Sequence, residues 1–411
     1  MEKIDILILG GGITGLSLAS YLNDNEDYLI LEKEKELGGY CKTTIRNGFV
    51  WDYSGHFFHF NDEKIKNKLI KNIDSKILTI SKISKIFYNE KYIDFPFQNN
   101  INELDKQEFI ECLVDLYFSN TTDDINNFKD FVYKHLGKSI SEKFIIPYNE
   151  KLYSCDLNNL DYDCMGRFFP KTTFLDVMNN MKGLKKSSYN DNFIYPEKGA
   201  QEFVKSICKD LNQNNIRKEE IIKNIDLLNK TVKTNKNEYK FNKLVSTLNF
   251  KDFLKLTKKD HSSFKSNKVV VFNIGFDKSS ENNFHWVYFP SDEIFYRVGF
   301  YDNILKSERM SLYVEIGVDS DDTINESELF SQVIMDLKKV GIVKNHKVVD
   351  YQMLILNPAY AHITKKSKLI YENWCDENNK NGIYSIGRYG SWTYCSIEDN
   401  IIQAKNISKK L

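Results

Sequence analysis

Short apolar runs separated by glycine open the chain and predict a βαβ unit. Residues 4–10 are predicted to form a buried strand, Leu16 to Leu22 a helix, and Tyr28 to Glu32 a second strand. Continuous apolar runs of this length are typical of strands that are buried on both faces of a parallel sheet. The beginning of the chain therefore predicts a Rossmann-type α/β domain.

From about residue 101 the apolar spacing becomes helical, and we expect a helical region that extends to about residue 190. The residues expected on the core faces of its first two helices are Phe109, Leu113, Val114 and Tyr117, and then Phe128, Phe131, Val132 and Leu136.

Between residues 268 and 318 the runs shorten and predict strands. These are Val269 to Phe276, Phe284 to Phe289, Phe295 to Phe300 and Leu312 to Val318. Because short polar turns separate them, the pattern favours an antiparallel sheet. The tail returns to a strand at Gly382 to Ile386, a glycine-rich turn and a final helix from about Asp399.

Composition narrows the class of protein. A chain of 411 residues predicts two or three domains, and no apolar stretch is long enough to span a bilayer or resembles a signal peptide. The net charge is zero, with Lys and Glu interspersed, which gives no indication of nucleic-acid binding. The seven Cys are scattered without a C-x-x-C pair, so we expect a reducing, cytoplasmic location.

The first glycine turn carries the chemistry of a dinucleotide site. Gly10, Gly12 and Gly15 form a G-x-G-x-x-G motif between a predicted strand and a predicted helix. Such glycines permit a tight turn, close approach of a pyrophosphate and close helix packing. Glu32 ends the second strand, where a carboxylate can accept ribose hydroxyls. The later Gly38-Gly39 favours FAD over NAD, and a glycine turn without any ligand is the alternative. No second motif of this kind occurs, which argues against a separate NAD(P)H domain.

Aromatic, arginine and histidine segments supply further candidates. His56 and His59 lack a third metal ligand of clear spacing, so a pocket wall, a place beside the flavin or ordinary core are the open readings. Of the 57 Lys and Arg residues only six are Arg. Two of these, Arg167 and Arg297, lie near Tyr-rich segments. Arg and Tyr together can bind a diphosphate because both donate hydrogen bonds to its oxygens. The segment from Phe95 to Asn100 joins an aromatic surface to an amide, although a strand end and turn would give the same pattern.

These segments, in this order, resemble the flavin-dependent UDP-galactopyranose mutases over nearly the whole chain. The motifs are the glycine fingerprint, Gly-His-x-x-His from Gly55, Pro-Phe-Gln-Asn-Asn from Pro96, Pro-Tyr-Asn-x-Lys from Pro147, Tyr-Pro-Glu-Lys-Gly from Tyr195, Tyr-Phe-Pro followed by Phe-Tyr-Arg, and Gly-Arg-Tyr-Gly-Ser-Trp-x-Tyr from Gly387.

The resemblance implies an FAD-binding Rossmann-like domain from residues 1–80, 191–260 and 375–411. A helical domain would follow from 101–190, and an antiparallel-sheet substrate domain from 81–100 and 261–374. It also implies FAD that is active when reduced, with N5 as the nucleophile in a redox-neutral isomerisation of UDP-galactopyranose to UDP-galactofuranose. The implied partners are a UDP-sugar and an external reductant for the flavin. The implied process is polysaccharide biosynthesis. Assembly into a homo-oligomer is left open.

Site residues follow from the matching motifs. Arg167 and Arg297 resemble the arginines that hold the diphosphate, and His56 and His59 resemble the histidines beside the flavin. The positions that resemble cofactor contacts are Gly10, Gly12, Gly15, Glu32, Lys33, Gly39, Arg388 and Glu398. Those that resemble substrate contacts are Phe97, Gln98, Asn149, Tyr153, Trp286, Tyr288, Tyr296, Tyr360 and Tyr394.

Two positions depart from the family pattern, because Tyr153 stands where Trp is common and Glu398 where Asp is usual. A mutase for a different nucleotide sugar therefore stays open. So does an FAD-dependent oxidase of the amine oxidase or protoporphyrinogen oxidase type, for which a hydrophobic tunnel is expected. A flavoprotein that binds without turnover is the third reading.

Overall fold

A parallel sheet at the N-terminal end of the chain organises one side of the molecule. The computed structural model describes residues 1–22, 26–119, 124–184 and 191–411. Within these ranges, β1 (Glu2–Leu9) lies between β2 (Tyr28–Leu31) and β12 (Glu238–Ser246) and is parallel to both. β9 (Ile216–Arg217) and β20 (Ile383–Ser385) extend the parallel pairing, next to β2 and β12 respectively. The strands β10 (Ile222–Asp226) and β11 (Thr231–Thr234) add an antiparallel edge.

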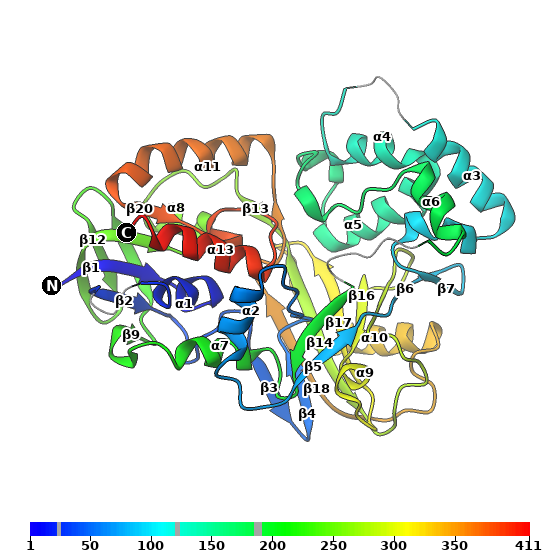
Figure 1. Cartoon of the computed structure of the whole chain (residues 1–411), viewed down its shortest axis with the longest axis horizontal. Helices are drawn as coiled ribbons and strands as arrows, with labels where there is room; N and C mark the ends of the chain where they lie inside the picture. Colours follow the sequence, from blue (N-terminus) through cyan, green and yellow to red (C-terminus); the bar gives the residue numbers. More distant parts are fainter. Residues whose placement is uncertain (23–25, 120–123, 185–190) are drawn as a thin grey trace.

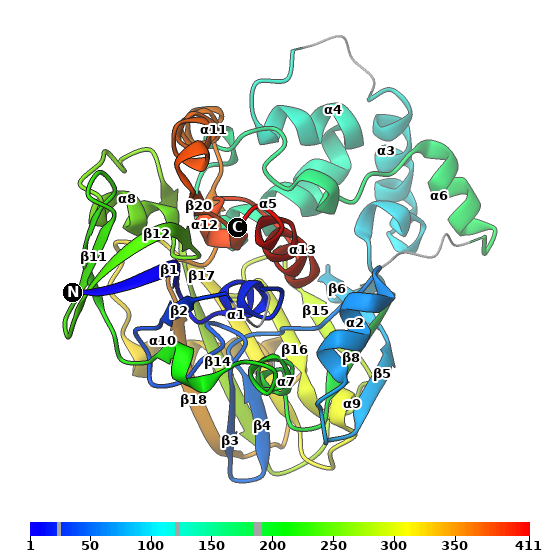
Figure 2. The same cartoon turned by 60° about the vertical axis from the view of Figure 1, so that its left-hand side comes forward.

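Helices lie against this sheet, which is why β1 has no exposed apolar face. α1 (Ile13–Ala19) packs between α13 (Ile397–Ser408) and α7 (Gln201–Cys208), as Figures 1 and 2 show. Residues Leu7 to Leu9 are fully buried as a result. The other helices of this half are α2 (Glu63–Ile70), α8 (Phe250–Leu256), α11 (Lys365–Asn378) and α12 (Gly387–Gly390).

A separate group of helices projects at the upper right of Figure 1. It consists of α3 (Lys106–Tyr117), α4 (Phe128–Ile140), α5 (Ile146–Tyr153) and α6 (Phe174–Met181). The predicted core face of α4 is largely right, since Phe128, Val132 and Leu136 are fully buried. The face predicted for α3 is half right, because Phe109 and Leu113 are partly buried and pack against the core.

In α3 the buried residues are Cys112 and Leu116, whereas Val114 and Tyr117 are exposed. The physical reason is that more than one apolar stripe of this helix fits the helical period, and the packing of α4 and other elements against α3 decides which one is buried.

A second, largely antiparallel sheet fills the lower right of Figure 1. Its order is β18 (Val348–Leu356), β14 (Lys268–Phe276), β17 (Ser311–Val318), β16 (Arg297–Phe300), β15 (Trp286–Tyr288), β6 (Ser84–Tyr88) and β7 (Lys91–Asp94). The four strands predicted between 268 and 318 are all present. One pairing differs from an antiparallel pattern, because β15 runs parallel to β6. α10 (Glu326–Lys339) covers one face, and α9 (Tyr301–Leu305) follows β16.

Short paired strands complete the architecture. They are β3 (Thr43–Arg46) with β4 (Phe49–Asp52), β5 (Ile77–Ser81) with β8 (Asn192–Pro196), and β13 (Lys265–Ser266) with β19 (Ala361–His362).

The helical group is fastened to the second sheet through α5. Its backbone approaches β17 so closely that a Cβ on Gly317 would lie 2.0 Å from the carbonyl oxygen of Lys151. The Lys151 ammonium donates to the carbonyl oxygens of Phe289 and Ser291, at 2.9 and 2.8 Å. Asn267 Nδ2 donates to the Leu152 carbonyl at 2.7 Å. These contacts fix one wall of a cavity between the helices and the sheet.

Candidate functional site

The glycine loop after β1 has the geometry of a dinucleotide cradle. Gly10 has a φ of +105°, which side-chain-bearing residues rarely adopt. A Cβ on Gly15 would lie 2.1 Å from the Gly10 carbonyl oxygen, so only glycine allows α1 to pack this close to the turn.

Gly12 differs from these two because it leaves open space. The nearest atom to a Cβ placed on Gly12 is the Cα of Gly39, at 3.9 Å. Gly12 is the N-cap residue of α1 and has no side chain to occupy this space. Two facing glycines thus line a gap that side chains would fill, at a helix end whose N–H groups favour phosphate oxygens. The residues present fit an FAD pyrophosphate: Gly12 and Gly39 would line its site, while Gly10 and Gly15 allow the tight turn and the close approach of α1.

Glu32 lies at the end of β2 beside this cradle. Its carboxylate accepts from the backbone N–H groups of Gly11 and Glu34, at 2.7 and 2.8 Å. Each carboxylate oxygen keeps lone-pair capacity for a ribose hydroxyl, which suits the predicted role. Lys33, by contrast, is 72% exposed and lies 3.9 Å from Glu34, so the structure places it on the surface.

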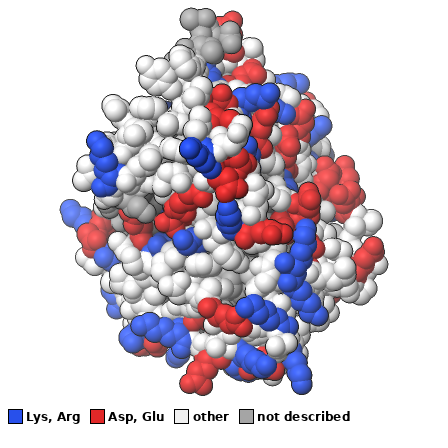
Figure 3. All heavy atoms as spheres, turned by 90° about the vertical axis from the view of Figure 1, so that its right-hand side faces the viewer, with Lys and Arg blue, Asp and Glu red and all other residues white. Residues whose placement is uncertain are grey.

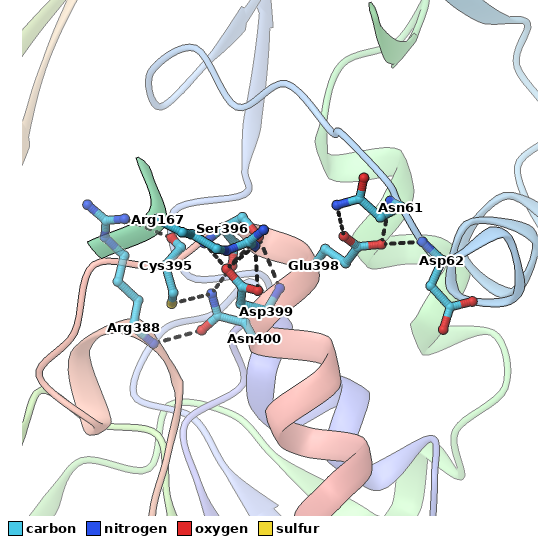
Figure 4. Close-up of polar contacts among 9 residues, drawn as sticks. All are labelled: Asn61, Asp62, Arg167, Arg388, Cys395, Ser396, Glu398, Asp399 and Asn400. Carbon is cyan, nitrogen blue, oxygen red and sulfur yellow. Dashed lines mark hydrogen bonds and ion pairs between the residues drawn. The ribbon is translucent and has the colours of Figure 1, made fainter. Parts of the chain in front are cut away.

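The C-terminal turn connects the cradle to the rest of the site. The side-chain oxygen of Asn400 accepts from Thr14 Oγ1 of α1 and from the backbone N–H of Arg388, at 3.0 and 2.7 Å. The Arg388 guanidinium lies 4.5 Å from the ring centre of Tyr394. Figure 4 shows Asn400 at the start of α13, with Arg388 and Glu398 on either side.

Glu398, predicted to contact FAD, has other contacts. It accepts from the backbone N–H groups of Asn61 and Asp62, both at 2.8 Å, and thereby ties α13 to the segment after His59.

A cavity of about 1160 Å³ lies between the helical group and the second sheet. It is large enough for a nucleotide sugar. The structure brings eight of the predicted residues to its wall: His59, Asn149, Tyr153, Arg167, Tyr288, Arg297, Tyr360 and Tyr394. A second hollow of about 600 Å³, lined by Tyr88, Glu111 and Lys138 among others, contains none of the predicted site residues.

Arg297 is the best-held cation in the cavity wall. Its Nε donates to Glu315, a carboxylate that is 1% exposed and also accepts from the Ser54 hydroxyl. Burial lowers the pKa of Arg297, but the adjacent Glu315 outweighs this and holds the pKa well above its ordinary value. Among the residues that the structure describes, the two terminal nitrogens of Arg297 have no hydrogen-bond partner. A permanently charged group with free donors at a cavity wall suits a phosphate.

Tyrosines form the rest of this wall. Tyr360 and Tyr394 stack at 6.2 Å, and Tyr153 meets Tyr360 edge-on at 5.6 Å. Tyr288 stacks on Phe95 at 4.8 Å, and its hydroxyl accepts from Trp286 Nε1 at 2.8 Å. Burial raises the pKa of Tyr288 and of Tyr360, so both hydroxyls keep their protons and can donate.

The two histidines occupy different surroundings. Burial lowers the pKa of His56 to about 4, although Glu315 opposes the shift, and its Nδ1 lies 3.2 Å from the Ser54 carbonyl oxygen. Burial also lowers the pKa of His59, whose Nδ1 lies 2.9 Å from the Asn192 carbonyl oxygen. Both rings are therefore neutral near pH 7. Within residues 1–22, 26–119, 124–184 and 191–411 no group of three or more His, Cys, Asp or Glu is placed to hold a metal ion.

Four predicted substrate contacts do not reach the cavity wall. Phe97 and Gln98 are fully buried, and Gln98 Nε2 donates to the Pro170 carbonyl at 2.6 Å. The cavity is lined instead by their neighbours Phe95 and Pro96. Trp286 stacks on a Phe57 ring at 5.2 Å behind Tyr288, and Tyr296 is 1% exposed. These four support the wall from behind.

Sequence reasoning missed two residues of the cavity region. Glu315 is the only acidic residue in the apolar run Leu312 to Val318, and a lone charge in a buried strand was the available signal. Lys82 lines the cavity with its ammonium 5.5 and 5.6 Å from the Phe95 and Trp286 rings. Burial lowers its pKa to about 8, and no sequence pattern distinguished it from other Lys.

Comparison with known proteins agrees with the cradle. Residues 8–71 match the family of NAD(P)-binding Rossmann-like domains. A UDP-galactopyranose mutase of Mycoplasma genitalium is 38% identical over 71 residues. That match covers 16% of this chain and 18% of the mutase, well under two thirds of its length.

Solved structures extend the similarity to the whole chain. The crystal structure of a reduced UDP-galactopyranose mutase matches with a TM-score of 0.92 and 21% identity, over 100% of this chain and 94% of that one. The fold is that of UDP-galactopyranose mutase. A candidate protoporphyrinogen oxidase from Exiguobacterium sp. has a TM-score of 0.77 and 16% identity, over 100% of this chain and 98% of its own. It is less similar to this chain than the UDP-galactopyranose mutase.

The predicted fold class is confirmed by these matches, with its Rossmann-type domain, helices and antiparallel sheet. The predicted domain boundaries stay a proposal. No helix in the described part of the chain is long and apolar enough to cross a membrane.

Proposed function

We propose that this protein is an isomerase that interconverts the pyranose and furanose forms of a nucleotide sugar, with UDP-galactopyranose as the first candidate substrate. The observation that carries the proposal is Arg297, a buried cation held by Glu315 with free donors toward a tyrosine-lined cavity. FAD in the reduced state would supply nucleophilic chemistry at N5, so that the reaction is redox-neutral overall.

The chain's own residues would bind and orient the substrate. Arg297 would donate to the diphosphate oxygens through its terminal nitrogens, and the Tyr360 and Tyr394 hydroxyls would add neutral donors. Their rings would exclude water from the reacting centre. The neutral imidazole of His56, beside Glu315 and Arg388, would offer a hydrogen-bonding group without adding positive charge.

The link between cradle and cavity supports this use of the two sites together. Thr14 at the glycine loop, Asn400 and Arg388 form a continuous hydrogen-bonded path, and Arg388 then contacts the Tyr394 ring at the cavity wall. A flavin held in the cradle would thus lie next to residues that also line the cavity.

An oxidase of the amine oxidase or protoporphyrinogen oxidase type is the second candidate, since the Exiguobacterium structure has a related fold. Such an enzyme is expected to have a hydrophobic tunnel. Among the described residues at the cavity wall, four cationic side chains outnumber three carboxylates, which favours an anionic substrate instead. The cations are Lys82, Arg167, Lys171 and Arg297, and the carboxylates are Asp94, Asp176 and Asp191.

Turnover of a panel of nucleotide sugars by the FAD-loaded protein, with and without dithionite, tests the proposal. We expect furanose product by chromatography only under reducing conditions and no oxygen consumption. Oxygen consumption with an amine or porphyrinogen substrate, and no product from any nucleotide sugar, would establish the oxidase. If UDP-galactopyranose is inert but another member of the panel reacts, the class stands and the substrate changes.

A further inference from the structure

The Arg167 guanidinium makes a two-pronged ion pair with Asp399 at the mouth of the cavity. Arg167 Nη2 lies 2.7 and 2.8 Å from the two carboxylate oxygens. Figure 4 shows Arg167 reaching across from the short helical turn Gly166–Phe168 to the first turn of α13. The pair joins two elements that are 232 residues apart in the chain.

Asp399 is firmly placed by contacts that do not involve Arg167. Its carboxylate accepts from the backbone N–H and the hydroxyl of Ser396, both at 2.9 Å, in a capping box that begins α13. Burial raises the pKa of Asp399, but the hydrogen bonds from Arg167 and Ser396 outweigh it and keep the carboxyl ionised. Asp399 is therefore a fixed anion that is 24% exposed, whereas the Arg167 side chain is 50% exposed and so is accessible to a ligand in solution.

The same guanidinium lines the cavity in which a diphosphate would bind. A phosphate group and Asp399 offer Arg167 the same kind of acceptor, two oxygens that share negative charge. The Nη2 nitrogen of Arg167 cannot donate to both oxygens of Asp399 and to two phosphate oxygens at the same time. Arg297 differs in which nitrogen is occupied: Glu315 contacts its Nε and leaves both terminal nitrogens for the ligand, whereas Asp399 occupies the terminal nitrogen Nη2 of Arg167.

We propose that Asp399 is a positioning residue that competes with the substrate's phosphate groups for Arg167 and so weakens the binding of nucleoside diphosphates. This inference rests on the proposed function. In the ligand-free protein the pair holds Arg167 against α13, and a bound diphosphate displaces the carboxylate. Only the fraction of molecules with Arg167 released binds at full strength, so the apparent affinity is the intrinsic affinity multiplied by that fraction. The pair also favours release of the nucleotide, since Arg167 forms its ion pair with Asp399 again when the nucleotide leaves.

Calorimetric titration of FAD-loaded protein with UDP tests the competition. Asp399→Asn keeps an oxygen that can cap α13 but removes the charge that holds Arg167. For a partly exposed ion pair we expect UDP to bind about two- to five-fold more tightly to this variant. The KM for the nucleotide sugar should fall as well, with no rise in kcat, because the product is also held more firmly.

Two controls separate competition from a structural effect. Ser396→Ala removes part of the same capping box and should leave the UDP affinity unchanged. In an Arg167→Ala background, Asp399→Asn should have no effect on UDP binding. Flavin absorbance verifies that each variant is folded.

The inference is overturned if wild type binds UDP and Asp399→Asn does not bind it more tightly. It also fails if Ser396→Ala has the same effect, or if the gain persists without Arg167. Wild-type protein that does not bind millimolar UDP at all would instead refute the proposed function.

Discussion

At the scale of single residues, burial decides the charge state of the site. Asp52 and His56 lie four residues apart, and burial shifts both of their pKa values, to about 6 and about 4 respectively. The Asp52 carboxylate accepts from the hydroxyl groups of Thr43 and Tyr195 and from the Ala200 N–H. The two groups make opposite contributions to the pH dependence of stability.

For His56 the folded protein binds a proton less readily than the unfolded chain, whose His has a pKa of about 6.5. Its contribution to stability is complete above that pH and is lost as the pH falls toward 4. For Asp52 the pKa is raised, so its contribution is present below about 3.8 and is lost as the pH rises through 6. Between pH 4 and 6 the two effects partly cancel.

We therefore predict that His56→Gln makes the protein less sensitive to acid. The free energy of unfolding of the variant should fall less than that of wild type between pH 6.5 and 4, because no buried imidazole has to be protonated. Urea unfolding at a series of pH values measures this. His261→Gln, at a partly exposed position, serves as the control, and an unchanged pH profile in His56→Gln would contradict the prediction.

Arg297→Lys tests the planar guanidinium at the same scale. Lys keeps a positive charge beside Glu315, whereas Ala would leave that carboxylate buried without a partner. We expect kcat/KM for the nucleotide sugar to fall about 10- to 100-fold with the flavin still bound, since an ammonium cannot replace two-pronged donors. Steady-state kinetics and flavin absorbance measure the two quantities. A variant with unchanged kcat/KM would show that the phosphate lies elsewhere.

At the scale of elements, different glycines of the loop after β1 serve helix packing and ligand binding. Gly15 is required for packing, because a Cβ there meets backbone, while Gly12 leaves room for a ligand. Gly12 has a φ of −81°, so Ala fits its backbone conformation.

We predict different outcomes for two otherwise similar substitutions. Gly12→Ala should fold with an unfolding free energy near that of wild-type apoprotein but bind FAD at least about 10-fold more weakly, because the methyl group occupies the cradle. Gly15→Ala should lose about 1–3 kcal/mol of stability with or without FAD. Chemical unfolding and flavin titration of both variants distinguish these results. Equal loss of stability in the two would contradict the assignment of the cradle to Gly12.

Sequence patterns predicted helices and strands most reliably where the apolar residues of an element allow only one choice of buried face. The strands between 268 and 318 and the βαβ start appear as predicted, since period and glycine spacing are local properties. The core face of α3 was predicted only in part, because more than one apolar stripe fits the helical period and the packed neighbours of the helix decide which is buried. The parallel pairing of β15 with β6 joins segments about 200 residues apart, which no local pattern encodes.

At the scale of the whole molecule, charge is balanced and spread out. Cationic and anionic side chains are interspersed over the face shown in Figure 3, in keeping with a net charge of zero. Under the proposed function, selectivity for an anionic ligand would therefore depend on the cations that line the cavity rather than on the overall field of the protein. These cations are Lys82, Arg167, Lys171 and Arg297.

A diphosphate that binds between the helical group and the second sheet should stabilise the folded molecule. With UDP at about 100 times its dissociation constant we expect roughly 2.7 kcal/mol of added stability, equivalent to a rise of a few degrees in Tm. Uridine, which lacks phosphate, should give a much smaller rise at the same concentration. Thermal unfolding of the FAD-loaded protein measures both. Equal shifts for the two ligands would contradict recognition through phosphate.

The sequence by itself determined the dinucleotide cradle, the strand and helix periods, and which Arg and Tyr residues were candidates for the site. These properties depend on residues that are near neighbours in the chain. Only the tertiary structure decided that Glu315 holds Arg297, that Asp399 holds Arg167, and that Phe97 and Gln98 are buried behind the cavity wall. The Arg167–Asp399 pair joins residues 232 apart in the chain, and even Arg297 and Glu315, 18 residues apart, meet only when β16 pairs with β17. Burial and ion pairing, which set the charge of each group and what it can contact, exist only after that packing has occurred.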